Sequence, residues 1–166
     1  MKLPPYRIYP SISDEKIMLR QILASDIQDV IEISSYYSIQ AETIEEATEM
    51  QKKIDKDYES GNSIAWGIVD KATNNIVGTG SYYLGLDKGI GELGCVLLPQ
   101  YRGKGFMSLA LQLALNFVRD TIGIKRPKAI TTKQNEKATQ LPERLNFIKI
   151  ATVQDNAIAY KLKPKV

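Results

Sequence analysis

The chain has 166 residues, of which 43% are hydrophobic and 25% are charged, a composition typical of one folded globular domain. Its formal net charge of +3 is too small to indicate nucleic-acid binding, and no apolar run is long enough to predict a membrane helix. The sequence contains no histidine and a single cysteine, Cys95, so histidine-dependent catalytic triads are excluded and no metal site is expected.

The N-terminal residues 1–15 include Pro4 and Pro5 and lack the apolar core of a signal peptide. We therefore expect a single domain that spans residues 1–166 and begins with an extended segment. A lone cysteine rules out an internal disulfide and suits a reducing compartment, so a cytoplasmic location is expected.

The first predicted elements are a strand at residues 17–23 and a short helix to about Ser35, which Ser25 and Asp26 would cap. Residues 43–46, Thr-Ile-Glu-Glu, fit a capping box and predict a second helix that ends near the sequence Ser-Gly-Asn. This second helix has a surplus of acidic residues, which would favour a cationic acceptor if the helix borders a substrate cleft. A solvated helix face is the simpler interpretation.

Three apolar runs with short connections follow, at residues 64–70, 76–84 and 90–98. Turn-forming residues separate the runs, at 71–75 and 85–89. Connections this short join antiparallel neighbours, so the three runs are predicted to form a meander.

The remaining part of the chain predicts a helix at residues 106–119, whose polar positions recur four apart and leave the other faces apolar. A strand at residues 128–132 then precedes a helix at about residues 135–145, and residues 147–153 and 157–162 predict a closing hairpin. The order of elements, with about seven strands, is that of an α+β domain.

Residues 99–105, Pro-Gln-Tyr-Arg-Gly-Lys-Gly, connect the third strand of the meander to the apolar helix. Gly103 and Gly105 permit a tight turn and a close approach of the main chain to a ligand. The helix that follows offers free N–H groups and a partial positive charge at its N-terminus, and Arg102 and Lys104 add formal charge. This combination favours the binding of a pyrophosphate group.

Two other phosphate-binding loops fit this segment less well. A Walker A loop needs Ser or Thr after Gly-Lys, whereas here Lys104 precedes Gly105. The dinucleotide fingerprint G-x-G-x-x-G would place its third glycine at Ser108, and it needs a parallel βαβ unit, whereas the preceding strand is predicted to belong to a meander. A glycine turn that binds nothing remains a further alternative for the loop taken by itself.

Residues 92–105 resemble motif A of the GNAT acetyltransferases, and in particular the branch of ribosomal-protein N-acetyltransferases. The family signature Q/R-x-x-G-x-G/A falls on residues 102–107, and residues 135–147 resemble the later family segment N-x-x-S-x-x-x-x-E-K-x-G-F. The resemblance implies a mixed, mostly antiparallel central sheet with helices on both faces. It also implies the transfer of an acetyl group from acetyl-CoA to a primary amine by direct attack.

The resemblance further implies roles for individual residues. Glu92 matches the family's strand glutamate and would act as the general base, through a water molecule. Main-chain groups near Val96 and Leu97 would contact the arm of acetyl-CoA that carries the acetyl group, beside a bulge that separates this strand from the next. The expected contacts of acetyl-CoA are Cys95, Val96, Leu97, Arg102, Gly103, Lys104, Gly105, Phe106, Met107 and Asn135.

Some residues depart from the family pattern. Met107 stands where the family has a small residue, and Pro142 stands where many members carry the tyrosine that protonates the leaving thiolate, so no general acid is assigned. Cys95 has no histidine to activate it and is expected to be an inert buried thiol. Tyr82 and Tyr83 are adjacent and therefore point to opposite faces of a strand, so that one of them could reach the acceptor cleft.

Two alternatives to the acetyltransferase interpretation stay open. One is a non-catalytic domain that binds acyl-CoA for regulation, and the other, with less support, is a nucleotide-binding module. The expected partner is an amine acceptor, either a small molecule or a protein N-terminus, without nucleic acid or membrane. The sequence does not identify this acceptor, and it leaves the formation of a homodimer open.

Overall fold

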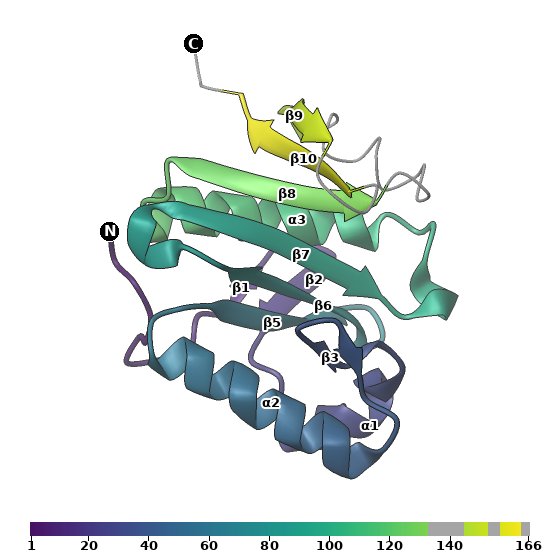
Figure 1. The fold of residues 1–166 in the computed structure, drawn as a ribbon. Coiled ribbons are helices and arrows are strands. Elements are labelled where there is room, and N and C mark those ends of the chain that lie inside the picture. The colour runs from purple at the N-terminus through teal and green to yellow at the C-terminus, as the bar shows by residue number, and fades with distance from the viewer. Residues whose placement is uncertain (133–144, 153–156, 164–166) are drawn as a thin grey trace.

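The computed structural model describes residues 1–132, 145–152 and 157–163 of the chain, and Figure 1 shows their arrangement. The helix predicted at residues 135–145 lies almost entirely outside the described residues. Within the part of the chain that is described, no helix has the length and apolar character needed to cross a membrane. The same part holds no group of three or more acidic or cysteine side chains that could bind a metal ion.

Eight strands among the described residues form one sheet in the order β1-β2-β5-β6-β7-β8-β10-β9 (Figure 1). The sequence predicted about seven of them, and the additional one is the two-residue strand β1, which pairs with β2. The strands are β1 (Ile12–Ser13), β2 (Ile17–Arg20), β5 (Ile64–Asp70), β6 (Asn75–Tyr83), β7 (Ile90–Leu97), β8 (Arg126–Thr132), β9 (Phe147–Thr152) and β10 (Ala157–Leu162).

The pairing of β7 with β8 is parallel, and the helix α3 (Phe106–Phe117) joins these two strands. The predicted meander of β5, β6 and β7 is confirmed by their antiparallel registers. The inference that β7, as a strand of the meander, does not start a parallel βαβ unit was wrong, because β7 leads through α3 into the parallel strand β8. Ser108, which takes the place of the third glycine, remains the feature that does not fit a dinucleotide-binding loop.

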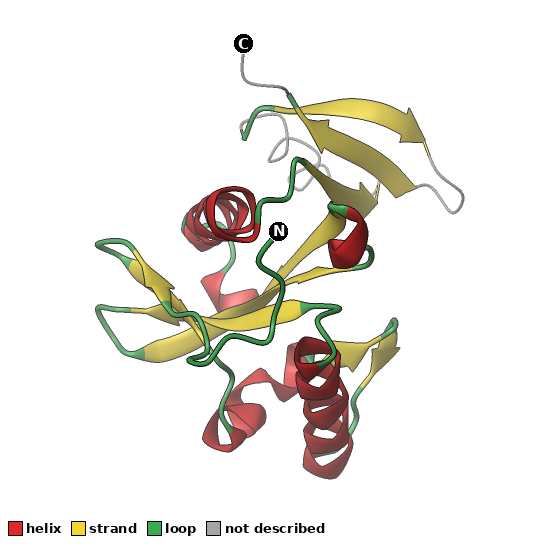
Figure 2. Ribbon diagram, turned by 90° about the vertical axis from the view of Figure 1, so that its left-hand side faces the viewer, coloured by secondary structure: helices red, strands yellow, loops and turns green. Residues whose placement is uncertain are grey.

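Helices cover both faces of the sheet, as expected (Figure 2). On one face, Phe117 of α3 packs edge-on against Trp66 of β5, with 5.7 Å between the ring centroids. The helices α1 (Ile27–Val30) and α2 (Ile44–Glu59) lie on the opposite face. The main hydrophobic core lies between α3 and the sheet, and its fully buried members include Trp66, Tyr82, Leu115 and Tyr160.

The N-cap that the sequence predicts at Thr43 forms, but the reciprocal bond of a capping box is made by the N–H of the residue before Thr43. The Thr43 side chain accepts a hydrogen bond from the Glu46 N–H at 3.1 Å, and the Glu46 carboxylate accepts one from the Glu42 N–H at 2.8 Å. The helix ends at Glu59, and Gly61 follows with a φ of +78°, a left-handed conformation that glycine adopts without strain. Local sequence therefore fixes both ends of α2.

The structure extends one predicted helix by a further turn and contains one hairpin that the sequence did not predict. After α3 ends at Phe117, the chain continues as a π-helical turn to Ile122, where Gly123 with a φ of +89° stops it. A hairpin that was not predicted, formed by β3 (Ser35–Tyr36) and β4 (Ile39–Gln40), stands between α1 and α2.

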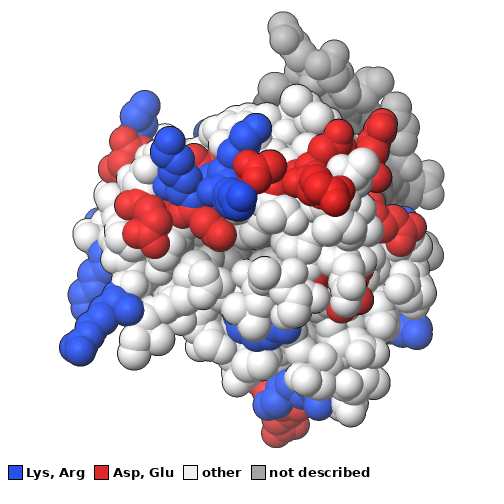
Figure 3. Space-filling model, turned by 90° about the horizontal axis from the view of Figure 1, so that it is seen from below, with Lys and Arg blue, Asp and Glu red and all other residues white. Residues whose placement is uncertain are grey.

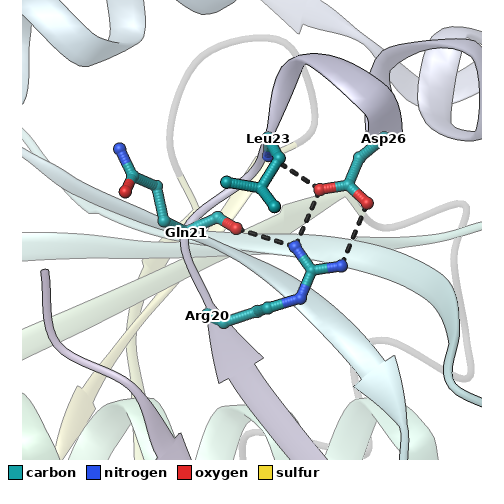
Figure 4. Close-up of polar contacts among 4 residues, drawn as sticks. All are labelled: Arg20, Gln21, Leu23 and Asp26. Atoms are coloured by element: carbon teal, nitrogen blue, oxygen red, sulfur yellow. Dashed lines mark hydrogen bonds and ion pairs between the residues drawn. The ribbon is translucent and has the colours of Figure 1, made fainter.

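The prediction for residues 17–35 is wrong in detail. β2 ends at Arg20, and the chain then forms a 3₁₀ turn, α1 and a second 3₁₀ turn in place of one continuous helix. As the N-cap residue of α1, Asp26 makes no side-chain bond into that helix, and its carboxylate instead bonds back toward the N-cap of the first 3₁₀ turn, Leu23. Its carboxylate accepts hydrogen bonds from both terminal nitrogens of Arg20, at 2.7 and 3.0 Å, and from the Leu23 N–H at 2.7 Å (Figure 4). These bonds tie the end of β2 to the start of α1.

The Asp26 side chain contributes to stability in a way that depends on pH. Burial would raise the pKa of its carboxyl, but the hydrogen bonds from Arg20 and Leu23 outweigh burial and lower that pKa below 3.8. We predict that Asp26→Asn lowers the free energy of unfolding by about 2 kcal/mol at neutral pH, because Arg20 loses its carboxylate partner. Since the folded-state pKa is the lower one, this difference is complete above about pH 5 and shrinks as pH falls through that pKa.

Denaturant unfolding of both proteins between about pH 3 and pH 7 measures this dependence. Asp29→Asn, which changes an exposed carboxylate of α1, is the matched control and is expected to shift stability by less than about 0.5 kcal/mol. An Asp26→Asn protein as stable as the wild type at neutral pH would contradict the role given to the pair.

Candidate active site

The second half of β7 has an open edge. Register pairs between β7 and β8 run from Ile90 with Arg126 to Leu93 with Ala129 and end there. Beyond this point β7 stays paired with β6, while β8 continues alongside β10. The main chain of residues 94–97 therefore has no strand beside it on the β8 side, among the strands that the structure describes.

Alternation along β7 decides which main-chain groups face the open edge. The Leu98 N–H donates to the Val77 carbonyl of β6 at 3.0 Å, so every second residue before it also bonds toward β6. Cys95 and Leu97 consequently direct their N–H and C=O groups toward the open edge. The Leu97 carbonyl accepts a hydrogen bond from the Arg102 Nε at 3.2 Å. Within the described part of the chain, the Leu97 N–H and both main-chain groups of Cys95 have no such partner and could bind a ligand.

The bulge expected in this strand is not seen. The pairing of β6 with β7 is continuous from Gly78 with Leu97 to Tyr83 with Glu92. β7 and β8 are paired only as far as Leu93 and Ala129. Along β7, main-chain groups continue to alternate regularly between the β6 side and the β8 side. Of the two residues expected to contact the acyl arm through their main chain, Leu97 faces the open edge and Val96 bonds toward β6.

The loop after β7 depends on two left-handed glycines. Gly103 has a φ of +75° and Gly105 a φ of +87°, values that other residues adopt only with strain. Open space surrounds the positions that their Cβ atoms would occupy, so backbone conformation and not crowding requires glycine here. Gly105 is also the N-cap of α3, and it has no side chain to accept the first N–H groups of the helix. Those N–H groups are therefore available to an anion.

Two exposed basic residues, Arg102 and Lys104, flank the start of α3. The Lys104 Nζ lies 5.8 Å from the centre of the Tyr101 ring. The first turn of α3 contains no acidic residue, so the positive charge of the helix start is not offset locally. Met107, the larger residue at the end of the signature, packs against the main core.

A cleft of about 490 Å³ lies on the α1 and α2 face of the sheet. Strands β5, β6 and β7 form its floor, and α2 and the β3–β4 hairpin contribute to its walls. Among the described residues, the charged side chains that line it are the carboxylates Asp57 and Glu92. Its other lining residues include Tyr36, Ile54, Ser63, Ala65, Tyr83, Leu84 and Val96.

Glu92 of β7 lies at this cleft and is held by Tyr83 of β6. The Tyr83 hydroxyl donates a hydrogen bond to the Glu92 carboxylate at 3.0 Å. Burial raises the pKa of Tyr83, and the charge of Glu92 raises it further, so the phenol remains a donor at neutral pH. A Cβ at Gly94 would lie 3.1 Å from the Tyr83 ring, so glycine at this position gives the ring room.

The adjacent tyrosines divide between core and cleft, as the alternation of a strand predicts. Tyr82 is fully buried in the main core on the α3 side. A Cβ at Gly91 would lie 1.8 Å from the Tyr82 ring, so only glycine fits beside it. Tyr83 is therefore the member of the pair that reaches the cleft.

The structure brings three of the predicted site residues, Glu92, Cys95 and Val96, to the lining of the cleft. Residues 102–107 follow directly as the loop and the start of α3, whereas Asn135 lies outside the described residues. Sequence analysis missed two groups of the cleft. Asp57 and Tyr36 line it and bond to each other, and the acidic surplus of the second predicted helix was the signal that pointed toward them.

The chain is similar to known acetyltransferases in sequence and in fold. A family model described as "Acetyltransferase (GNAT) domain" matches residues 16–148. The chain is 25% identical over 150 residues to the uncharacterized N-acetyltransferase YoaA of Bacillus subtilis, a match that covers 86% of this chain and 85% of that protein.

Two solved structures share the fold. The apo form of RimL, a ribosomal L7/L12 alpha-N-protein acetyltransferase, has a TM-score of 0.79 at 16% identity and covers 96% of this chain and 98% of its own. The microcin C7 self immunity acetyltransferase MccE, solved with acetyl-CoA and AMP, has a TM-score of 0.75 at 15% identity, with 89% and 92% of the two chains covered.

The thiol of Cys95 offers a direct test of the geometry around β7. Burial raises the pKa of this thiol to about 12, although the residue as a whole is only partly buried. We predict that the folded protein reacts with a thiol reagent about 10³-fold more slowly than an exposed cysteine does near pH 8, because the thiolate fraction is that much smaller.

With an aromatic disulfide as the reagent, the absorbance of the thiolate that it releases measures this rate. Because the chain has a single cysteine, the signal reports on Cys95 alone. The same protein unfolded in guanidinium serves as the control and should react at the ordinary rate. Equal rates before and after unfolding would contradict the burial of the sulfur.

Proposed function

Because the chain belongs to the GNAT acetyltransferase family, we propose that it transfers the acetyl group of acetyl-CoA to a primary amine by direct attack. The observation that carries this proposal is the succession of three features along β7. A carboxylate of the cleft lies near its start, an open edge follows, and a glycine loop leads into a helix N-terminus. The carboxylate can bind an amine, the open edge can bind the arm that carries the acyl group, and the helix N-terminus can bind a pyrophosphate.

The residues at these positions have the chemistry that acetyl-CoA requires. The N–H groups at the start of α3, with Arg102 and Lys104, suit the pyrophosphate. The main-chain groups of Cys95 and Leu97 suit the amides of the arm, which can pair with the open edge as an added strand does. Acetyl-CoA, when bound, supplies an acetyl group activated as a thioester.

In the proposed reaction a bond forms between the amine nitrogen and the acetyl carbon, and the carbon–sulfur bond breaks. Glu92 accepts the proton that the amine must lose, through a water molecule, while Tyr83 fixes the position of the carboxylate. An N–H group of the open edge donates to the thioester oxygen as negative charge develops there. The leaving sulfur takes its proton from water or from the acceptor ammonium.

One observation favours a second candidate, a non-catalytic domain that binds acyl-CoA for regulation. Pro142 occupies the place of the family's tyrosine, and it lies outside the described residues. Against this candidate, one oxygen of Glu92 has no hydrogen-bond partner among the described residues and can hold the water that a base needs. We therefore keep the enzyme as the proposed function.

We predict that Glu92→Gln lowers kcat/KM by about 10² to 10³, the usual contribution of a general base, with little change in the affinity for acetyl-CoA. Glutamine keeps the size of the side chain and still accepts the hydrogen bond from Tyr83, but it does not accept a proton. Steady-state acetylation of a panel of amines measures the effect. Glu59→Gln, at an exposed position of α2 outside the cleft, is the matched control and should keep wild-type kcat/KM.

If Glu92→Gln retains wild-type turnover between about pH 6 and pH 9, Glu92 has a structural role and the amine must arrive already neutral.

The loop is tested by comparing Gly105→Glu with Gly105→Gln. Both side chains have similar size and strain the same left-handed position, but only glutamate adds a negative charge. We predict that the Glu variant binds CoA at least about tenfold more weakly than the Gln variant, because its carboxylate repels the pyrophosphate. Isothermal titration calorimetry with CoA measures both affinities, and equal values would locate the pyrophosphate elsewhere.

A further inference from the structure

The cleft pairs two carboxylates with two tyrosine hydroxyls. Tyr83 donates to Glu92 at 3.0 Å, and Tyr36 of the β3–β4 hairpin donates to Asp57 of α2 at 2.9 Å. Each hydroxyl occupies one carboxylate oxygen, and the other oxygen has no hydrogen-bond partner within the described part of the chain. Each carboxylate can therefore accept a charge-assisted hydrogen bond from a cation.

The two carboxylates lie on different sides of the cleft. Tyr83 is the register partner of Glu92 on the next strand, and β5, the strand beyond it, begins at Ile64. Asp57 lies near the start of β5, because its carbonyl accepts a hydrogen bond from the Asn62 N–H at 2.9 Å. Neighbouring strands are about 4.8 Å apart, so Glu92 and the start of β5 are separated by roughly 10 Å within the sheet, and Asp57 lies on the helix α2 that covers the sheet. One ammonium group is too small to contact both.

The charge of the cleft also differs from that of the chain. No lysine or arginine lines the cleft among the described residues, although the chain as a whole has a net charge of +3. On the outer surface seen from the α1 and α2 side, by contrast, basic and acidic side chains lie next to one another (Figure 3). The two carboxylates can each be neutralised by a cation that enters the cleft.

The remaining surface of the cleft is largely apolar. Ile54 and Ala65 line it together with the ring of Tyr83. Leu84 and Val96, which also line it, are 53% and 41% exposed. An alkyl chain that joins two ammonium groups would cover this apolar surface and remove it from water.

We propose that the acceptor is an alkyl diamine, with one nitrogen held by Asp57 and the other acetylated beside Glu92. The proposal rests on the acetyl transfer proposed above and names its substrate class. A protein N-terminus presents one ammonium group, so it would leave the second carboxylate without a counter-charge in an apolar cleft, at a cost in free energy. Asp57 and Tyr36 are thus residues that determine specificity, and they take no part in the bond changes.

The test compares cadaverine with pentylamine, which has the same carbon chain and lacks the second nitrogen. The wild type is expected to acetylate cadaverine with a kcat/KM at least about tenfold higher, the effect of one charge-assisted contact. Asp57→Asn should abolish this preference without lowering kcat/KM for pentylamine, because the alkyl end of that amine then no longer faces a carboxylate that lacks a cation. The matched control is Asp55→Asn, on the same helix but outside the cleft lining, where the carboxylate bonds to Gln51 and the preference should persist.

The possible outcomes separate the two proposals. A wild type that acetylates both amines equally, or an Asp57→Asn protein that keeps the preference while its thermal unfolding matches the wild type, would overturn the diamine proposal alone. If neither amine is acetylated, calorimetric titration with cadaverine decides whether the cleft binds a diamine at all. Binding that Asp57→Asn weakens would support the diamine site and reject the proposed transfer, and no binding to the wild type would overturn the diamine site as well.

Discussion

Four residue pairs join β7 to β8, and after Leu93 the strand β7 has a neighbouring strand on its β6 side only, among the residues that the structure describes. Main-chain groups that lose a partner inside a sheet are costly unless other groups satisfy them. Arg102 reaches back to the Leu97 carbonyl and meets part of this need, and the groups that remain face an edge where a ligand can supply the rest. The open edge therefore links the loop to the cleft, because Glu92 of the cleft, the open edge and the loop follow one another along the chain.

Regular alternation along β7 also decides which side chains face the cleft and which face the main core. Glu92 and Gly94 share the face of the cleft with Tyr83, whereas Leu93 belongs to the core on the other face with Tyr82. The glycines in this short stretch have separate reasons, since Gly91 makes room for the Tyr82 ring and Gly94 for the Tyr83 ring. A bulge in the strand would exchange the two faces locally and would move a carboxylate or a ring to the wrong side.

Sequence could predict the features that depend on neighbouring residues. The N-cap at Thr43, the meander and the glycine loop are local patterns, and the structure has all three. The β3–β4 hairpin escaped prediction because its turn uses Tyr37 and Ser38 at φ values of 47° and 64°, where glycine or asparagine would be the usual signal. The parallel pairing of β8 and the bond between Tyr36 and Asp57 depend on tertiary packing, which no local pattern encodes.

The length of β7 separates the negative charge of Glu92 from the positive charges of Arg102 and Lys104. Glu92 lies near the start of the strand, and Arg102 and Lys104 follow its end. The five residue steps from Glu92 to Leu97 alone span roughly 17 Å in an extended strand. That distance exceeds the screening length of about 8 Å at physiological ionic strength, so the cations of the loop do little to neutralise the carboxylate. The same strand can thus attract an anion at one end and a cation at the other, which is what an enzyme needs when its donor carries phosphates and its acceptor carries an ammonium group.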